Sequence, residues 1–197
     1  MAAAREPVGS LPTLMFQNEA AWAAWLQANH GGSPGVWLHL AKKSSGVQSM
    51  SYAEALEVAL CYGWIDGQKK SAGEKAWLQK FTKRGKKSIW SKINREKAIA
   101  LIEDRRMKPA GLREVERAKQ DGRWEAAYDS PSGAAVSSDF QAALHQSPRA
   151  KTNFAALNGM NRYAFLFRIQ TAKRAETRAR RIQQFIQMLE RNEKIHS

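Results

Sequence analysis

The chain has 197 residues, of which 43% are hydrophobic and 25% are charged, and its 32 lysines and arginines against 18 acidic residues leave a net charge of +14. This length supports one compact domain, or one domain with a helical appendage. The apolar fraction excludes an intrinsically disordered protein, and the lack of a Gly-X-Y or heptad repeat excludes a fibrous one.

The first part of the chain predicts helices mixed with a few strands. Residues 1–12, rich in proline and glycine, predict a loose tail. Apolar residues at helical spacing predict a helix after Asn18, and Ser51 with Glu54 forms the capping box of a second helix. Two further helices are expected, one after Ser91 and one over 109–119. Short apolar runs bounded by turn residues predict three strands, at 36–40, 64–67 and 77–82.

The remainder of the chain predicts helices alone. The first covers 139–146, the second begins at Ser147 and ends at Gly159, and the third begins at Asn161. The last carries four apolar residues at helical spacing, Ala179, Ile182, Ile186 and Leu189. Because the strands form a cluster and do not alternate with helices, the predicted fold class is helix-rich α+β and not a doubly wound parallel sheet. The expected organisation after the tail is an α+β unit over 13–128, a linker over 129–138 and an all-helical unit over 139–197.

The positive charge is concentrated in two blocks. Residues 61–110 hold 14 basic and 5 acidic residues, and residues 151–197 hold 10 and 3, whereas the remaining segments are nearly neutral. This asymmetry favours an anionic partner, either a nucleic acid or an acidic protein surface. Solubility alone is the alternative explanation.

Each block supplies a candidate anion-binding surface. In the first, lysines are interleaved with Trp77, Phe81 and Trp90, and such residues bind phosphates and stack on unpaired bases when they are exposed. The alternative is an aromatic core beside a solvated basic loop. In the second, arginines spaced i, i+4, i+7 form a helical stripe, which a solvated face or a structural clamp explains equally well. The candidate anion-binding residues are Lys80, Lys83, Arg84, Lys86, Lys87, Lys92, Lys173, Arg174, Arg178 and Arg181.

The sequence contains no recognisable catalytic or cofactor motif. Walker A, G-x-G-x-x-G and G-x-S-x-G strings are missing, so neither catalytic residues nor a cofactor is predicted. The four histidines and the single cysteine lack the spacing of metal ligands, so no metal site is predicted. Cys61 has no histidine in a partner context and is expected to be buried. Tyr62, Trp64 and Asp66 are the candidate residues of an enzyme pocket, although Asp66 also fits a turn or cap position.

Several long strings resemble a known bacterial family, over residues 16–194. They are Ser-Tyr-Ala-Glu-Ala-Leu (51–56), Cys-Tyr-Gly-Trp-Ile-Asp-Gly-Gln-Lys-Lys (61–70), Trp-Ser-Lys-Ile-Asn-Arg-Glu-Lys (90–97) and Gln-Thr-Ala-Lys-Arg-Ala-Glu-Thr-Arg-Ala-Arg-Arg-Ile (170–182). The family is the YdeI/OmpD-associated, or bacteriocin-protection, family. This resemblance implies protection against bacteriocins or cationic antimicrobial peptides and association with an envelope protein, and it supplies no catalytic residues.

The expected function is therefore non-enzymatic stress and bacteriocin protection, exercised by binding an anionic or protein partner. A nucleic-acid-binding protein that uses segments 80–92 and 173–181 is the alternative, and an enzyme with a pocket near Tyr62–Asp66 is the third hypothesis. A protein-binding role predicts an exposed apolar patch, for which the last helix is the candidate. The chain shows no secretory signal pattern and no run of about 18 apolar residues, and one cysteine forms no internal disulfide, so a cytoplasmic location is expected.

Overall fold

The computed structural model describes residues 11–47 and 49–196, so the predicted tail lies outside the described residues except for its last two positions. The chain divides into two compact units. Unit 1 comprises the chain up to Ser88 together with Asn94–Trp124, and unit 2 comprises Ile89–Ile93 together with the chain from Glu125. The segment predicted as a linker, 129–138, is grouped with unit 2.

Unit 1 is built on a four-stranded sheet with the order β1-β2-β4-β3. Its strands are β1 (Thr13–Leu14), β2 (Val36–Ala41), β3 (Trp64–Ser71) and β4 (Ala76–Lys83). β1 pairs with β2 in parallel, and the other two pairs are antiparallel. The three predicted strands are confirmed. β2 and β4 are one or two residues longer than predicted, β3 is twice as long, and β1 was not predicted.

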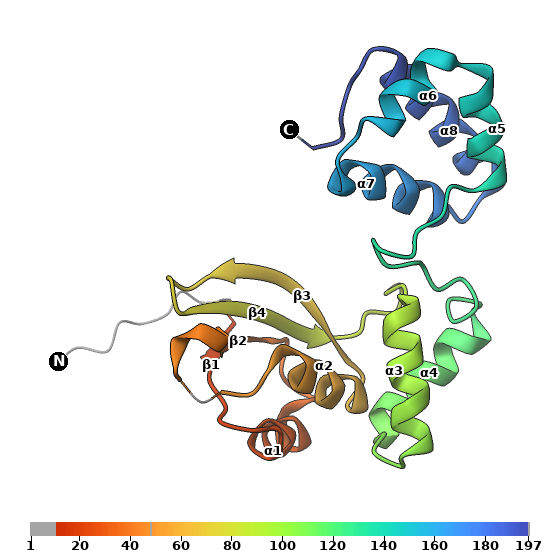
Figure 1. The fold of residues 1–197 in the computed structure, drawn as a ribbon. Coiled ribbons are helices and arrows are strands. Elements are labelled where there is room, and N and C mark those ends of the chain that lie inside the picture. Colours follow the sequence, from red (N-terminus) through yellow and green to blue (C-terminus); the bar gives the residue numbers. More distant parts are fainter. Residues whose placement is uncertain (1–10, 48, 197) are drawn as a thin grey trace. The chain divides into compact units, whose positions relative to one another are not determined.

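Two helices, α1 (Glu19–Asn29) and α2 (Tyr52–Cys61), lie on one side of this sheet (Figure 1). The predicted capping box of Ser51 and Glu54 is confirmed. Asn18, after which the first helix was predicted, is its N-cap, and its side chain accepts a hydrogen bond from the backbone N–H of Ala21. Trp22 of α1 is fully buried, and alternate residues of β2 are buried with it. The core of the unit therefore lies between the two helices and one face of the sheet.

A short 3-10 helix η1 (Lys43–Ser45) follows β2, and the helices α3 (Lys92–Glu103) and α4 (Pro109–Gln120) follow β4. α4 approaches α2 so closely at Gly111 that a Cβ there would overlap the backbone carbonyl oxygen of Cys61. Glycine is thus required for this helix contact.

From Glu125 to residue 196, unit 2 is built from the helices α5 (Ser138–Gln146), α6 (Pro148–Ala155), α7 (Gly159–Gln170) and α8 (Ala175–Glu190). Their core includes four phenylalanines, Phe140, Phe154, Phe165 and Phe185. The predicted boundary at Gly159 is wrong. α6 ends at Ala155, and Gly159 begins α7, because Asn158 is its N-cap and accepts a hydrogen bond from the backbone N–H of Asn161.

The helix-rich α+β fold class is thus confirmed, with the strands in unit 1 and helices alone in the described part of unit 2. Within residues 11–47 and 49–196, no helix is long and apolar enough to cross a membrane. The same residues contain no group of three histidine, cysteine, aspartate or glutamate side chains placed to hold a metal ion.

Candidate functional site

The residues of the first basic block differ in their exposure and in the groups that they contact. Arg84 is only 3% exposed and is therefore buried, and Lys83 is exposed but donates to the carbonyl of Gly31 at 3.0 Å. Lys92 forms an ion pair with Asp129 at 2.5 Å. Of the remaining predicted lysines, Lys86 and Lys87 are exposed in the loop after β4, and Lys80 lies within β4.

The aromatic residues of this block belong largely to the interior. Phe81 and Trp90 are 0% and 2% exposed, and Trp77 is half-buried. The core interpretation therefore holds for Phe81 and Trp90, which are closed to a nucleic-acid base.

In the second basic block, two of the four predicted residues are engaged within unit 2. Arg178 donates two hydrogen bonds to the carboxylate of Asp139, at 2.6 and 2.9 Å, and a third to the carbonyl of Ile169 at 3.0 Å. Arg181 donates to the carbonyl of Arg168. Lys173 and Arg174 are exposed just before α8. Hydrogen bonds from the Arg178 guanidinium hold the pKa of the Asp139 carboxyl well below its usual range.

The three residues of the candidate enzyme pocket make separate contacts. Trp64 is fully buried, and its indole N–H donates to a backbone carbonyl at 3.1 Å. Asp66 accepts a hydrogen bond from the hydroxyl of Tyr52 at 2.8 Å, and the hydroxyl of Tyr62 donates to Gln27 at 3.1 Å. Tyr62 also borders a hollow of about 330 Å³ beside Cys61. Burial raises the pKa of the Cys61 thiol, which therefore stays protonated at neutral pH and is a poor nucleophile.

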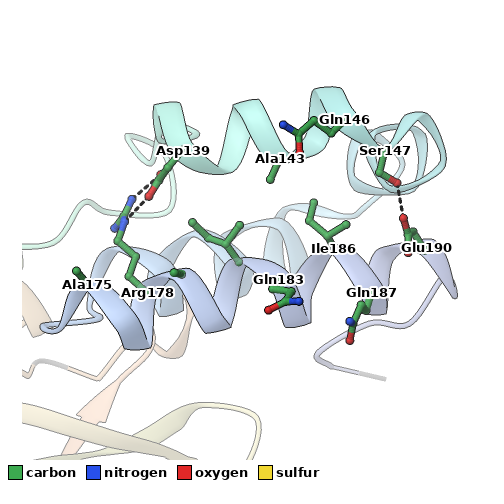
Figure 2. A pocket seen from close by; sticks show the side chains of 12 residues that line it. Asp139, Ala143, Gln146, Ser147, Ala175, Arg178, Gln183, Ile186, Gln187 and Glu190 are labelled. Atoms are coloured by element: carbon green, nitrogen blue, oxygen red, sulfur yellow. Dashed lines mark hydrogen bonds and ion pairs between the residues drawn. The ribbon is translucent and has the colours of Figure 1, made fainter.

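A larger hollow, of about 710 Å³, lies between α5 and α8 in unit 2 (Figure 2). We call it the α5–α8 groove. Its apolar lining consists of Ala143, Ala175, Ala179, Ile182 and Ile186. Three glutamines supply hydrogen-bonding groups beside this apolar surface, namely Gln146, Gln183 and Gln187. Figure 2 shows these side chains projecting from the two facing helices.

Polar contacts join the two walls at both ends of the groove (Figure 2). One end is the ion pair between Arg178 and Asp139, and the other is the hydrogen bond that Ser147 donates to Glu190 at 2.7 Å. Arg178 and Glu190 are twelve residues apart on α8, which corresponds to roughly 18 Å of helix. The α5–α8 groove is therefore apolar along about three helical turns, and a polar contact between its two walls closes each end.

Small side chains on α8 open the groove. Ile182 and Leu189 are 9% and 0% exposed and hold the helix to the core, whereas Ala179 is exposed and Ile186 is half-buried. The sequence predicted the helical spacing of these four residues and an apolar patch on this helix. It did not predict that α5 forms the other wall of the groove, because α5 contributes only one apolar lining residue, Ala143.

Two family models match the chain. Residues 14–114, just over half of the chain, match a domain of unknown function, DUF8412. Residues 134–192 match the model described as bacteriocin-protection, YdeI or OmpD-associated. No curated protein and no solved structure matches the chain.

The two matches divide between them the strings that carry the predicted resemblance. The strings at 51–56, 61–70 and 90–97 lie within the DUF8412 match, and most of the string at 170–182 contributes to α8 in the other. All residues that line the α5–α8 groove fall between Asp139 and Glu190. The groove is thus formed wholly by the segment that matches the bacteriocin-protection model.

Proposed function

This chain belongs to the DUF8412 family, whose model matches residues 14–114, and its residues 134–192 match the bacteriocin-protection model. We propose that it protects cells by binding a protein partner and not by catalysis. The description of the second family names protection and an association, and it names no reaction. The observation that carries the proposal is the α5–α8 groove, since its lining residues come entirely from that family's segment.

The dimensions of the groove suit one helix of a partner. An amphipathic helix binds an apolar groove through residues at i, i+3 or i+4, and i+7, which span two turns. The α5–α8 groove offers about three turns of apolar lining between its two polar ends. Gln183 and Gln187 stand beside the apolar lining, where they would hydrogen bond to the polar edge of such a helix.

The charge of the groove further defines this partner. Asp139 is neutralised by Arg178, whereas Glu190 forms no ion pair with any described residue of the chain. Glu190 therefore supplies one negative charge at this end of the groove, where the neighbouring Arg191 is paired with Glu193. We expect the bound helix to place a lysine or arginine over Glu190, because a complementary charge fixes the direction of docking. An envelope protein, as the OmpD-associated description suggests, is the first partner to examine.

Substitution of Ala179 by tryptophan tests the proposal. Ala179 is exposed and lines the groove, so an indole there fills the channel without entering the core. Ala142→Trp is the matched control, because Ala142 is exposed on α5 and does not line the groove. The assay is the survival of bacteria that lack their own copy and express the full chain, challenged with a bacteriocin.

We expect the wild-type chain and Ala142→Trp to protect equally. Ala179→Trp should protect much less, because steric overlap in the groove weakens partner binding about tenfold or more. Equal thermal unfolding of the two variants excludes misfolding as the cause. Full protection by Ala179→Trp would show that the groove takes no part in protection. A lack of protection by the wild-type chain would contradict the protective function itself.

A further inference from the structure

The sheet of unit 1 has a second face, opposite the helices α1 and α2 (Figure 1). Along β2, Val36, Leu38 and Leu40 are buried against the core, so Trp37 and His39 project from the opposite face. The strand register adds residues of β4 and β3 to that face, because directly paired residues share a side. We call the resulting surface the outer sheet face, and its larger side chains include Trp37, His39, Ile65, Lys70, Leu78 and Lys80.

Two lysines lie beside the indole at the centre of this face. The Nζ atom of Lys70 is 4.3 Å from the centroid of the Trp37 ring, and that of Lys80 is 5.9 Å from it. The three residues come from three adjacent strands, and Trp37 and Lys80 are direct partners in the ladder. None of the described strand residues whose side chains share this face is acidic.

A β-bulge determines which lysine joins the outer sheet face. Asp66 pairs with Phe81 and Lys69 pairs with Gln79, so β3 has one extra residue there. The side chain of Gln79 stabilises the bulge by donating to the carbonyl of Gly67 at 2.9 Å. As a result Lys69 lies on the helix side of the sheet, with its Nζ 4.9 Å from the Trp77 ring, and Lys70 lies on the outer side.

From this arrangement we propose that the outer sheet face binds single-stranded nucleic acid. An unpaired base stacks on Trp37, and the ammonium groups of Lys70 and Lys80 bind the adjacent phosphates. Aromatic side chains between cations on a sheet are the elements that recognise unpaired strands, because every base offers a ring face and every phosphate a charge. In the unbound protein the lysines contact the indole through weak cation–π interactions, which phosphate ion pairs readily replace.

Other anionic partners fit this face less well. Duplex DNA keeps its bases stacked inside the helix, so the indole would have no base to contact. A membrane surface requires large apolar side chains that protrude. Trp37, Ile65 and Leu78 are all half-buried, which leaves a ring face open to a base but gives the sheet no residue that inserts into a lipid layer. The proposed site also differs from both basic segments of the sequence, since it retains only Lys80 and adds Trp37 and Lys70.

Neighbouring lysines on β3 provide the decisive comparison. Lys69→Gln and Lys70→Gln remove the same charge at adjacent exposed positions, but only Lys70 lies on the outer sheet face. Binding of the full chain to labelled 12-nucleotide oligo-U RNA and oligo-dT DNA is measured by fluorescence anisotropy over a series of salt concentrations. Matched duplex DNA and phosphatidylserine-containing vesicles serve as comparison ligands.

We expect Lys70→Gln to weaken binding of the single strands and to reduce the log–log salt slope by about 0.7, while Lys69→Gln leaves both nearly unchanged. Trp37→Leu should weaken binding roughly five- to hundredfold, and Trp37→Phe, which retains an aromatic ring, should weaken it less. Preference for RNA or for DNA identifies which strand is bound, and either one supports the site.

Equal losses in Lys69→Gln and Lys70→Gln would overturn the proposal, because they would show that diffuse charge alone drives binding. Tighter binding of duplex DNA or of vesicles than of single strands would also overturn it. If Trp37→Leu proves unstable in thermal unfolding, the two lysine variants and Trp37→Phe decide the question. The result does not depend on the α5–α8 groove, whose residues lie in the other unit.

Discussion

Arg178 is the residue at which the anion-binding and structural interpretations of the basic blocks can be separated. Its guanidinium donates to both carboxylate oxygens of Asp139 and to the carbonyl of Ile169. The two charged side chains are 28% and 44% exposed, so solvent screens the pair in part. A forked pair of this exposure contributes about 1 kcal/mol to folding, and loss of the carbonyl bond adds about 0.5–1 kcal/mol. Arg178→Gln should therefore destabilise the protein by about 1.5–2 kcal/mol.

The pH dependence of this loss has a definite sign. The pKa of Asp139 is lowered in the folded protein, chiefly by its hydrogen bonds from Arg178, so the carboxyl binds fewer protons in the folded than in the unfolded state. The contribution of the pair is therefore complete above the ordinary aspartate pKa of about 3.9. It declines as the pH falls below that value towards the lower pKa of the folded state.

A double-mutant cycle of Arg178→Gln and Asp139→Asn measures the pair directly. Urea unfolding is followed by far-UV circular dichroism at pH 7 and pH 3, and tryptophan fluorescence separately follows unit 1, which holds six of the seven tryptophans. We expect a coupling energy of about 1 kcal/mol at pH 7 and a smaller one at pH 3. A zero coupling energy at pH 7, or one that is unchanged at pH 3, would refute the structural role of Arg178.

A substitution in α4 and a chemical modification of a cysteine in α2 test how α2 is packed. Gly111→Ala should destabilise unit 1 by about 1–3 kcal/mol in urea unfolding, because the added Cβ would overlap a backbone carbonyl oxygen. Gly159→Ala is the control. Its added Cβ would meet no atom within 4 Å, so this variant should be nearly as stable as the wild-type chain. Equal stability of the two variants would show that α4 does not approach α2 as described. Cys61 should react with a disulfide reagent at pH 8 at least about tenfold more slowly in the folded chain than in the urea-unfolded chain. The reason is that burial raises the pKa of its thiol and restricts access to it. Equal rates would contradict the burial of Cys61.

Much of the secondary structure could be predicted because its signals are local. The cap at Asn18 and the Ser51–Glu54 capping box are fixed by residues three positions apart, and both are present. β1 could not be predicted because it has only two residues and is defined by its pairing with β2, which is not visible in the local sequence. The sequence predicts the start of α7 two residues too late, because glycine commonly ends a helix, whereas Asn158 before Gly159 acts as an N-cap.

The candidate sites were less predictable because they depend on tertiary contacts. Simple alternation along β3 would place Lys70 on the same side as Asp66, and the bulge between Asp66 and Lys69 reverses this. The burial of Arg84 and the hydrogen bonds of Arg178 are likewise decided by neighbours distant in sequence. A count of charges therefore predicted a basic surface but not which cations belong to it.

Net charge and binding site are separate properties in this chain. An ion pair uses one cation for each anion, so pairs such as Arg178–Asp139 leave the excess of +14 unchanged. The excess positive charge therefore resides on lysines and arginines without acidic partners. Such a side chain binds an anion specifically only where a second contact positions the same ligand. Trp37 offers that contact to Lys70 and Lys80, whereas Lys86 and Lys87 are exposed in a loop. Charge alone would attract any anion, but a lysine placed beside an indole discriminates an unpaired base from a duplex or a lipid.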